Sequence, residues 1–146
     1  MGVTFSGGVQ IFILLVWLVL SIAMITIGVL YKNECPLKPL IPIYLIVAGA
    51  SYILTILLLP LRYSCRQLCA VLEVFLLIFI ICWLITGSVW VFSIHLVYPL
   101  LCNTVLYQFS FGVLVFQYIY IVIVSVTLVL VICFTGFKSL TKASLI

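Results

Sequence analysis

Three side chains in this sequence could take part in proton transfer or ion binding: Glu34, Glu73 and His95. Catalysis requires several polar groups that converge on one point. The topology predicted from the basic residues puts Glu34 and His95 outside and Glu73 near the cytosolic face, so Glu73 is too far from the other two to share a site. The sequence contains no nucleophile elbow, no phosphate-binding loop and no cluster of metal-ligand residues. We therefore expect no catalytic residue, no metal site and no cofactor, and we predict that the protein is not an enzyme.

Glu73 is the charged residue whose position most suggests a function. It lies roughly one turn inside a long apolar stretch, and a carboxylate within a membrane span often marks an ion path. Gln117 is a second polar residue inside such a stretch. Alternatively, the Glu73 side chain extends to the membrane surface and meets Arg66, two turns away. The sequence favours this second interpretation and leaves both open.

The composition identifies the surroundings of the chain. Hydrophobic residues make up 68% of the 146 residues and charged residues 5%, against roughly a quarter charged in an average soluble domain. Such a chain cannot cover a surface that faces water, so its main partner is the lipid bilayer. The net charge of +4 therefore belongs to loops beside membrane spans and indicates no nucleic-acid partner. The charged residues are Lys32, Glu34, Lys38, Arg62, Arg66, Glu73, Lys138 and Lys142.

Four apolar stretches are long enough to cross roughly 30 Å of hydrocarbon as helices that rise about 1.5 Å per residue. They cover about 9–30, 40–59, 70–92 and 109–134. We predict an all-α fold, an integral membrane four-helix bundle that forms a single transmembrane domain. Its loops are short, and no soluble domain is expected.

The segment before the second stretch contains three prolines at every third position, Pro36, Pro39 and Pro42. A polyproline-II segment has three residues per turn, so this spacing predicts a stiff, extended connection. Pro42 suits the first turn of the helix that follows.

Two groups of residues are candidates for helix packing. Gly49 lies in a run of small residues, which let helix backbones approach closely in lipid. Trp83, Gly87 and Trp90 are spaced four and three residues apart and so share one helical face. This face could be a platform for a ligand or partner; we favour a groove at Gly87 with the tryptophans packed beside it.

The distribution of basic residues predicts the orientation. With four spans, both termini and the middle loop lie on one side, which holds Arg62, Arg66, Lys138 and Lys142. The other side holds only Lys32 and Lys38. The positive-inside rule then places both termini in the cytosol. We expect the protein in the plasma membrane or in another membrane of the secretory pathway.

This topology separates the six cysteines. Cys35 and Cys102 fall in the two loops on the non-cytosolic side, where disulfides form, and we predict that they pair. The alternative is two unpaired thiols.

Three positions are candidates for lipid attachment. Cys65 and Cys69 lie beside the membrane near arginines and are candidates for palmitoylation. Two cysteines alone supply too few ligands for zinc. The N-terminal residues match the pattern M-G-x-x-x-S/T, which makes Gly2 a candidate for myristoylation.

Three segments of the sequence resemble a known family of membrane proteins. They are C-P-L-K-P-L-I-P-I-Y-L-I-V-A-G from Cys35, W-L-I-T-G-S-V-W-V-F from Trp83, and C-N-x-x-L-Y-Q-F-S-F from Cys102. Together they resemble the small four-span transmembrane protein 272-like family over the middle of the chain. The resemblance implies a four-span topology, and Cys35 and Cys102 both occur in its motifs. It implies no catalytic or binding residue.

Two classes of function remain. The sparse polar groups and the packing residues favour a structural or partner-binding membrane bundle, which assembles as a homo-oligomer or with another membrane protein. The alternative is a subunit of an oligomeric ion channel or transport pore. Glu73 favours this alternative because a carboxylate within a membrane span often marks an ion path. Four helices cannot enclose a wide pore, so a channel requires a ring of subunits.

Overall fold

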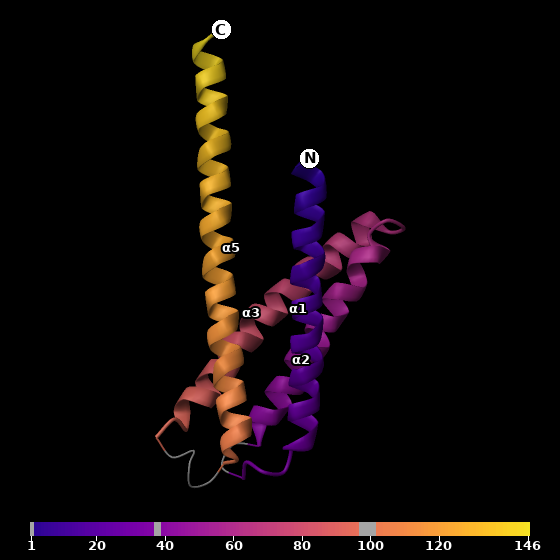
Figure 1. Ribbon diagram of the computed structural model, residues 1–146, viewed down its shortest axis with the longest axis vertical. Coiled ribbons are helices and arrows are strands. Elements are labelled where there is room, and N and C mark those ends of the chain that lie inside the picture. The colour runs from indigo at the N-terminus through magenta and orange to yellow at the C-terminus, as the bar shows by residue number, and fades with distance from the viewer. Residues whose placement is uncertain (1, 37–38, 97–101) are drawn as a thin grey trace. The chain divides into compact units, whose positions relative to one another are not determined.

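The structure, a computed structural model, describes residues 2–36, 39–96 and 102–146. It contains the long helices α1 (Gly2–Leu30), α2 (Leu40–Leu61), α3 (Arg66–Ser93) and α5 (Thr104–Ser144), and no described residue lies in a strand (Figure 1). All four helices are long and apolar enough to cross a membrane. The predicted all-α fold class of a multi-pass membrane protein is confirmed.

The chain divides into two compact units, which we describe separately. The first covers Met1–Phe111 and contains α1, α2, α3 and the first turns of α5. The second covers Gly112–Ile146, the remainder of α5 and the residues after it.

The helices extend beyond the predicted spans at several ends. α1 begins at Gly2, α3 begins at Arg66, and α5 runs for 41 residues from Thr104 to Ser144. A helix of that length measures about 60 Å, roughly twice the thickness of the hydrocarbon core. A helix needs no lipid to persist past the boundary, because its hydrogen bonds are internal. Lys138 and Lys142 therefore lie on helical turns.

α2 is the central helix of the first unit, because it packs against both α1 and α3. In its most apolar stretch 39% of residues are buried, against 17% in α1 and 11% in α3. The residues of α2 that are fully enclosed include Ile41, Tyr44 and Leu45. The core of the unit consequently lies along α2.

Two glycines permit the close approach of α1 and α2. A Cβ atom on Gly49 would lie 2.8 Å from the Ser21 carbonyl oxygen, and one on Gly28 would lie 2.9 Å from the Pro42 carbonyl oxygen. Both distances are too short for a real side chain, so only glycine fits at these positions. Small residues at helix contacts are a common means of association in lipid.

Hydroxyl groups inside the spans are satisfied within their own helices. The side chains of Ser21, Ser51 and Ser88 donate to the carbonyl oxygens four residues earlier, at 2.6, 2.8 and 2.8 Å respectively. An unpaired polar group in hydrocarbon would cost several kcal/mol. These serines are therefore small side chains at the helix contacts, and they expose no unpaired polar group to lipid.

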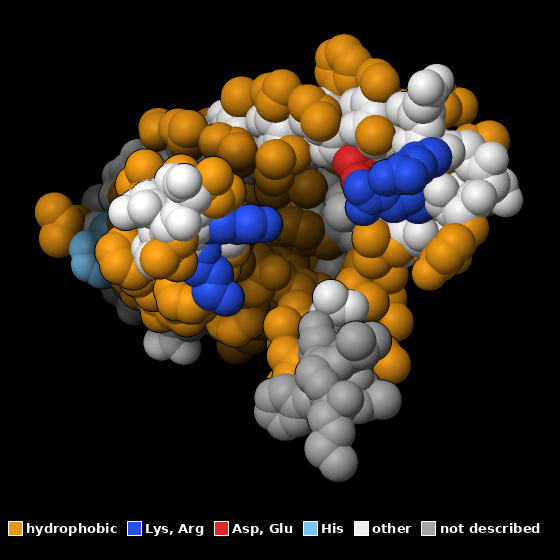
Figure 2. All heavy atoms as spheres, turned by 90° about the horizontal axis from the view of Figure 1, so that it is seen from above, with side chains coloured by type: hydrophobic (Ala, Val, Ile, Leu, Met, Phe, Trp, Pro, Cys, Tyr) orange, Lys and Arg blue, Asp and Glu red, His pale blue; other side chains and the backbone are white. Residues whose placement is uncertain are grey.

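Large apolar side chains cover the surface of the helices. On α3 they include Phe75, Leu77 and Val89, each more than half exposed. The space-filling view is dominated by hydrophobic side chains, with basic groups confined to small patches (Figure 2). This is the surface of a protein whose spans face lipid.

The connection from α1 to α2 differs from the prediction. Pro39 has φ −63° and ψ −9°, a right-handed helical conformation, and it immediately precedes α2. The polyproline-II prediction is therefore wrong at Pro39, because the φ that proline imposes suits a helix start equally well. Leu37 and Lys38 lie outside the described residues. Pro42 lies in the first turn of α2, as predicted.

Candidate functional site

The contact between α2 and α3 is built around Tyr44 and Gly87. Tyr44 is 1% exposed, and a Cβ atom on Gly87 would overlap three carbon atoms of its ring. The tyrosine ring therefore occupies the space that a side chain on Gly87 would need. The ring packs directly against this glycine, and the groove expected at Gly87 stays a prediction.

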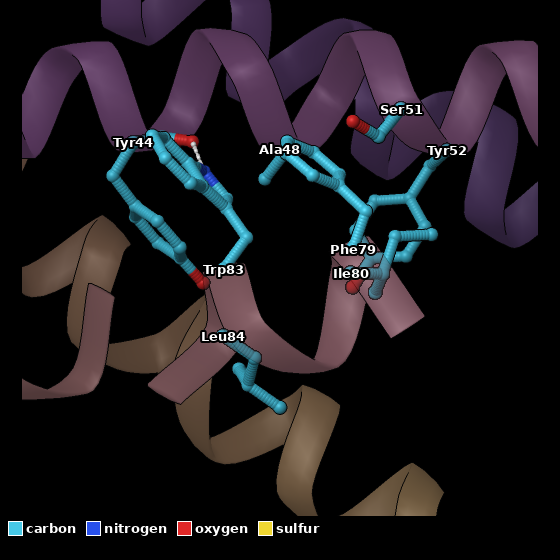
Figure 3. A pocket seen from close by; sticks show the side chains of 8 residues that line it. All are labelled: Tyr44, Ala48, Ser51, Tyr52, Phe79, Ile80, Trp83 and Leu84. Atoms are coloured by element: carbon cyan, nitrogen blue, oxygen red, sulfur yellow. Dashed lines mark hydrogen bonds between the residues drawn. The ribbon is translucent and has the colours of Figure 1, made fainter. Parts of the chain in front are cut away.

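Trp83 closes the same contact from one turn earlier on α3. Its indole Nε1–H donates to the Tyr44 carbonyl oxygen at 3.2 Å, and the two rings are stacked with centroids 6.4 Å apart (Figure 3). The Trp90 ring meets Trp83 edge-on at 5.7 Å. We call Tyr44, Trp83, Gly87 and Trp90 the aromatic contact. It joins two of the three segments that carry the family resemblance.

A small pocket lies beside the aromatic contact, between α2 and α3 (Figure 3). The cavity has a volume of about 10 Å³, about the least that a single water molecule needs. Its lining is mostly aromatic and aliphatic, from Tyr44, Ala48, Ser51, Tyr52, Phe79, Ile80, Trp83 and Leu84. It supports no assignment of a ligand.

A disulfide joins the connections at one end of the first unit. Cys35 and Cys102 are bonded, as predicted, across a separation of 67 residues. Both cysteines are almost fully buried, at 1% and 7% exposure. We call this region, with residues 34–36, 94–96 and 102–107, the disulfide end.

Asn103 strengthens the disulfide end in three ways. Its backbone N–H donates to the Glu34 carbonyl oxygen at 3.1 Å, and its side-chain amide donates to the Glu34 carboxylate. Its Oδ1 accepts the backbone N–H of Val105 at 2.9 Å, which caps the start of α5. One residue thus fixes the position of Glu34 and begins the last helix.

His95 and Tyr107 form a second polar contact at the disulfide end. The His95 Nδ1 and the Tyr107 hydroxyl are 2.9 Å apart, and Tyr107 is buried. The Phe111 ring stacks on His95 at 6.1 Å. These contacts tie the residues after α3 to the first turns of α5. Sequence reasoning missed them, although Tyr107 and Phe111 belong to the third resembling segment.

The charged pair at the opposite end is Arg62 and Glu73. Arg62 Nη1 lies 3.7 Å from Glu73 Oε2, with side-chain exposures of 54% and 24%. The prediction that Glu73 meets Arg66 is wrong, because Glu73 pairs with Arg62. Arg62 follows the last turn of α2, and the antiparallel packing of α2 and α3 places Arg62 beside α3. Figure 2 shows an acidic group next to basic side chains on a surface otherwise rich in hydrophobic groups. We call the end of the first unit that carries Arg62, Arg66 and Glu73 the arginine end.

The remaining candidate residues are placed as follows. Cys65 is exposed and Cys69 is buried, so only Cys65 is accessible for palmitoylation as the structure stands. Gly2 is the first residue of α1, and Gln117 lies on α5 in the second unit. Within the described ranges, no group of three metal-ligand side chains occurs. The palmitoylation and the myristoylation stay predictions.

Comparison with known proteins identifies one relevant similarity. Human transmembrane protein 272 is 29% identical to this chain, over 77% of the chain and 77% of that protein. No family model matches the chain, and no solved structure matches it. The similarity supports the resemblance to the transmembrane protein 272-like family that the three segments carry.

Proposed function

We propose that this multi-pass membrane protein is a structural or partner-binding bundle, and that it has no catalytic activity. The aromatic contact carries the proposal. It brings two of the resembling segments together as packing, with Tyr44 enclosed by Gly87 and Trp83. Residues of this kind build a rigid support for neighbouring membrane helices and offer no reactive group to a substrate.

The surface supports the same proposal. In the first unit, α1 and α3 expose long rows of apolar side chains, and serine hydroxyls inside the spans bond to their own helices. The surface available to a partner is therefore apolar. A second copy of the chain, or a transmembrane helix of another protein, can pack against it.

We also propose that both termini face the cytosol. Arg62 and Arg66 lie at the arginine end, whereas the α1–α2 connection carries Lys32 beside Glu34. Lys38 lies outside the described residues. This asymmetry matches the positive-inside rule.

The alternative, a subunit of an ion channel, depends on Glu73. Its carboxylate lies in the second turn of α3 and accepts no hydrogen bond from the described residues. However, the Arg62 guanidinium lies 3.7 Å away, and its positive charge repels a cation that approaches the carboxylate. This pairing makes the channel the second candidate.

The oligomeric state distinguishes the two candidates. We propose to measure the mass of the protein in lipid discs and to image the particles. A monomer or compact dimer is expected for a structural bundle. A closed ring with an axial hole would favour the channel, because only an oligomer can enclose a pore.

A further inference from the structure

The Glu73 carboxylate lacks the hydrogen bonds that its position requires. Its separation from Arg62 Nη1, 3.7 Å, exceeds the length of a hydrogen bond. The other oxygen, Oε1, is buried and has no hydrogen-bond partner among the described residues. A carboxylate can accept about four hydrogen bonds, and a buried acceptor without a partner destabilises the folded protein. Because the protein encloses Oε1, a donor from outside the chain would meet the carboxylate at Oε2, which faces Arg62 without a hydrogen bond.

The surroundings indicate where that donor comes from. Arg62 follows the end of α2, and Glu73 lies two turns into α3, at the end of the spans that carries the exposed basic residue Arg66. Tyr63, beside Arg62, is 96% exposed. Basic and aromatic residues at span ends lie at the level of the lipid headgroups. The molecules closest to Glu73 are therefore phospholipid headgroups.

We propose that Arg62 and Glu73 together bind the headgroup of a phospholipid that carries a primary ammonium. The Arg62 guanidinium binds the phosphate, for which its planar set of donors is well suited. The ammonium has three N–H donors and supplies the hydrogen bond that Glu73 lacks. A two-carbon link joins phosphate and ammonium in an ethanolamine headgroup, so both charges reach neighbouring partners.

The exposures of the two side chains agree with this arrangement. Arg62 is 54% exposed and can turn toward a phosphate without losing a hydrogen bond, because its contact with Glu73 is an ion pair only. Glu73 is 24% exposed, and Oε2 is the oxygen that faces Arg62. The ammonium therefore binds Oε2, and Oε1 stays buried.

The test compares headgroups that differ in N–H donors alone. The protein is placed in discs of phosphatidylcholine that contain a minor fraction of phosphatidylethanolamine, or of its singly or doubly methylated form. Lipid that stays bound after mild extraction is counted by native mass spectrometry. We expect retention of the ethanolamine lipid to exceed that of the choline lipid about tenfold, as for one charge-assisted hydrogen bond, and to fall with each added methyl group.

Variants assign the effect to the pair. Glu73→Gln should remove the preference for the ammonium, and Arg62→Gln should weaken retention of every phospholipid. Glu34→Gln, at the disulfide end, is the matched control and should retain the full preference. Equal retention of ethanolamine and choline lipids by the wild type would overturn the proposal, as would a preference that survives in Glu73→Gln. If Glu73→Gln does not fold, the methylation series on the wild type decides.

Discussion

The Tyr44 ring lies in the space that any side chain on Gly87 would occupy. This relationship fixes the separation of α2 and α3, since the ring is buried and Trp83 donates a hydrogen bond to the same tyrosine's carbonyl oxygen. A large ring fits only where the facing helix has a glycine, so this contact allows one register of the two helices. In a bilayer, apolar burial alone would favour no register over another.

Gly87→Ala should destabilise the protein by about 1–3 kcal/mol, the usual cost of overpacking a filled contact. The measurement is unfolding in detergent micelles, followed by tryptophan fluorescence because Trp83 lies in the contact. Gly8→Ala, on α1, is the matched control: a Cβ atom there would meet nothing within 4 Å. It should be neutral or slightly stabilising, as alanine favours helix over glycine. Equal stability of the two variants would contradict the packing described here.

A smaller residue at position 44 should partly compensate for the alanine. Tyr44→Leu removes the ring that overlaps the new methyl group of Gly87→Ala. The double variant should therefore lose less free energy of unfolding than the two single variants lose in sum. Strict additivity, measured in the same unfolding experiment, would show that the two residues do not share a contact.

Removal of the disulfide should destabilise the first unit by roughly 2–4 kcal/mol. Cys35→Ser, Cys102→Ser and the double variant should behave alike, since each breaks the same bond. Thermal unfolding and gel mobility with and without reductant measure the effect. Cys65→Ser is the control, because that cysteine is free and exposed. Unchanged stability of the double variant would contradict a structural role for the bond.

Asn103→Ala should cost more than Asn103→Ser. Both remove the amide that donates to Glu34, but serine can still cap α5 through its hydroxyl, a contribution of about 1 kcal/mol. Unfolding of the two variants in parallel gives the difference. Serine and alanine variants of the same stability would show that Asn103 acts through Glu34 alone.

Accessible cysteines can test the orientation. Leu96 is 91% exposed at the disulfide end and Tyr63 is 96% exposed at the arginine end. In a Cys65→Ser background, Leu96→Cys should react with a membrane-impermeant maleimide on intact cells. Tyr63→Cys should react only after permeabilisation. The reverse pattern would place the termini outside the cytosol.

The helices could be predicted from sequence because a long apolar run leaves few other structures in lipid. The Cys35–Cys102 pairing followed from topology, which placed only these two cysteines on the side where disulfides form. The partners of Asn103 and His95 could not be predicted in this way. Asn103 meets Glu34 across 69 residues of sequence, and that contact depends on how the helix ends meet.

Two errors have simple physical causes. The sequence predicts that Glu73 meets Arg66, two turns away, but Arg62, which follows the antiparallel neighbour α2, lies 3.7 Å from the Glu73 carboxylate. The spacing of the prolines predicted an extended segment, yet Pro39 adopts a helical ψ next to α2. The first error depends on the pairing of two helices, and the second on the local start of a helix, which the φ of proline suits equally well.

Ion flux through reconstituted vesicles tests the proposed structural role most directly. Wild-type protein and Glu73→Gln are incorporated at equal density, and flux of monovalent and divalent cations is recorded across voltage and pH against empty vesicles. A structural bundle predicts no flux above that of empty vesicles for either protein. Wild-type conductance whose ion selectivity changes in Glu73→Gln would contradict it and would establish the channel.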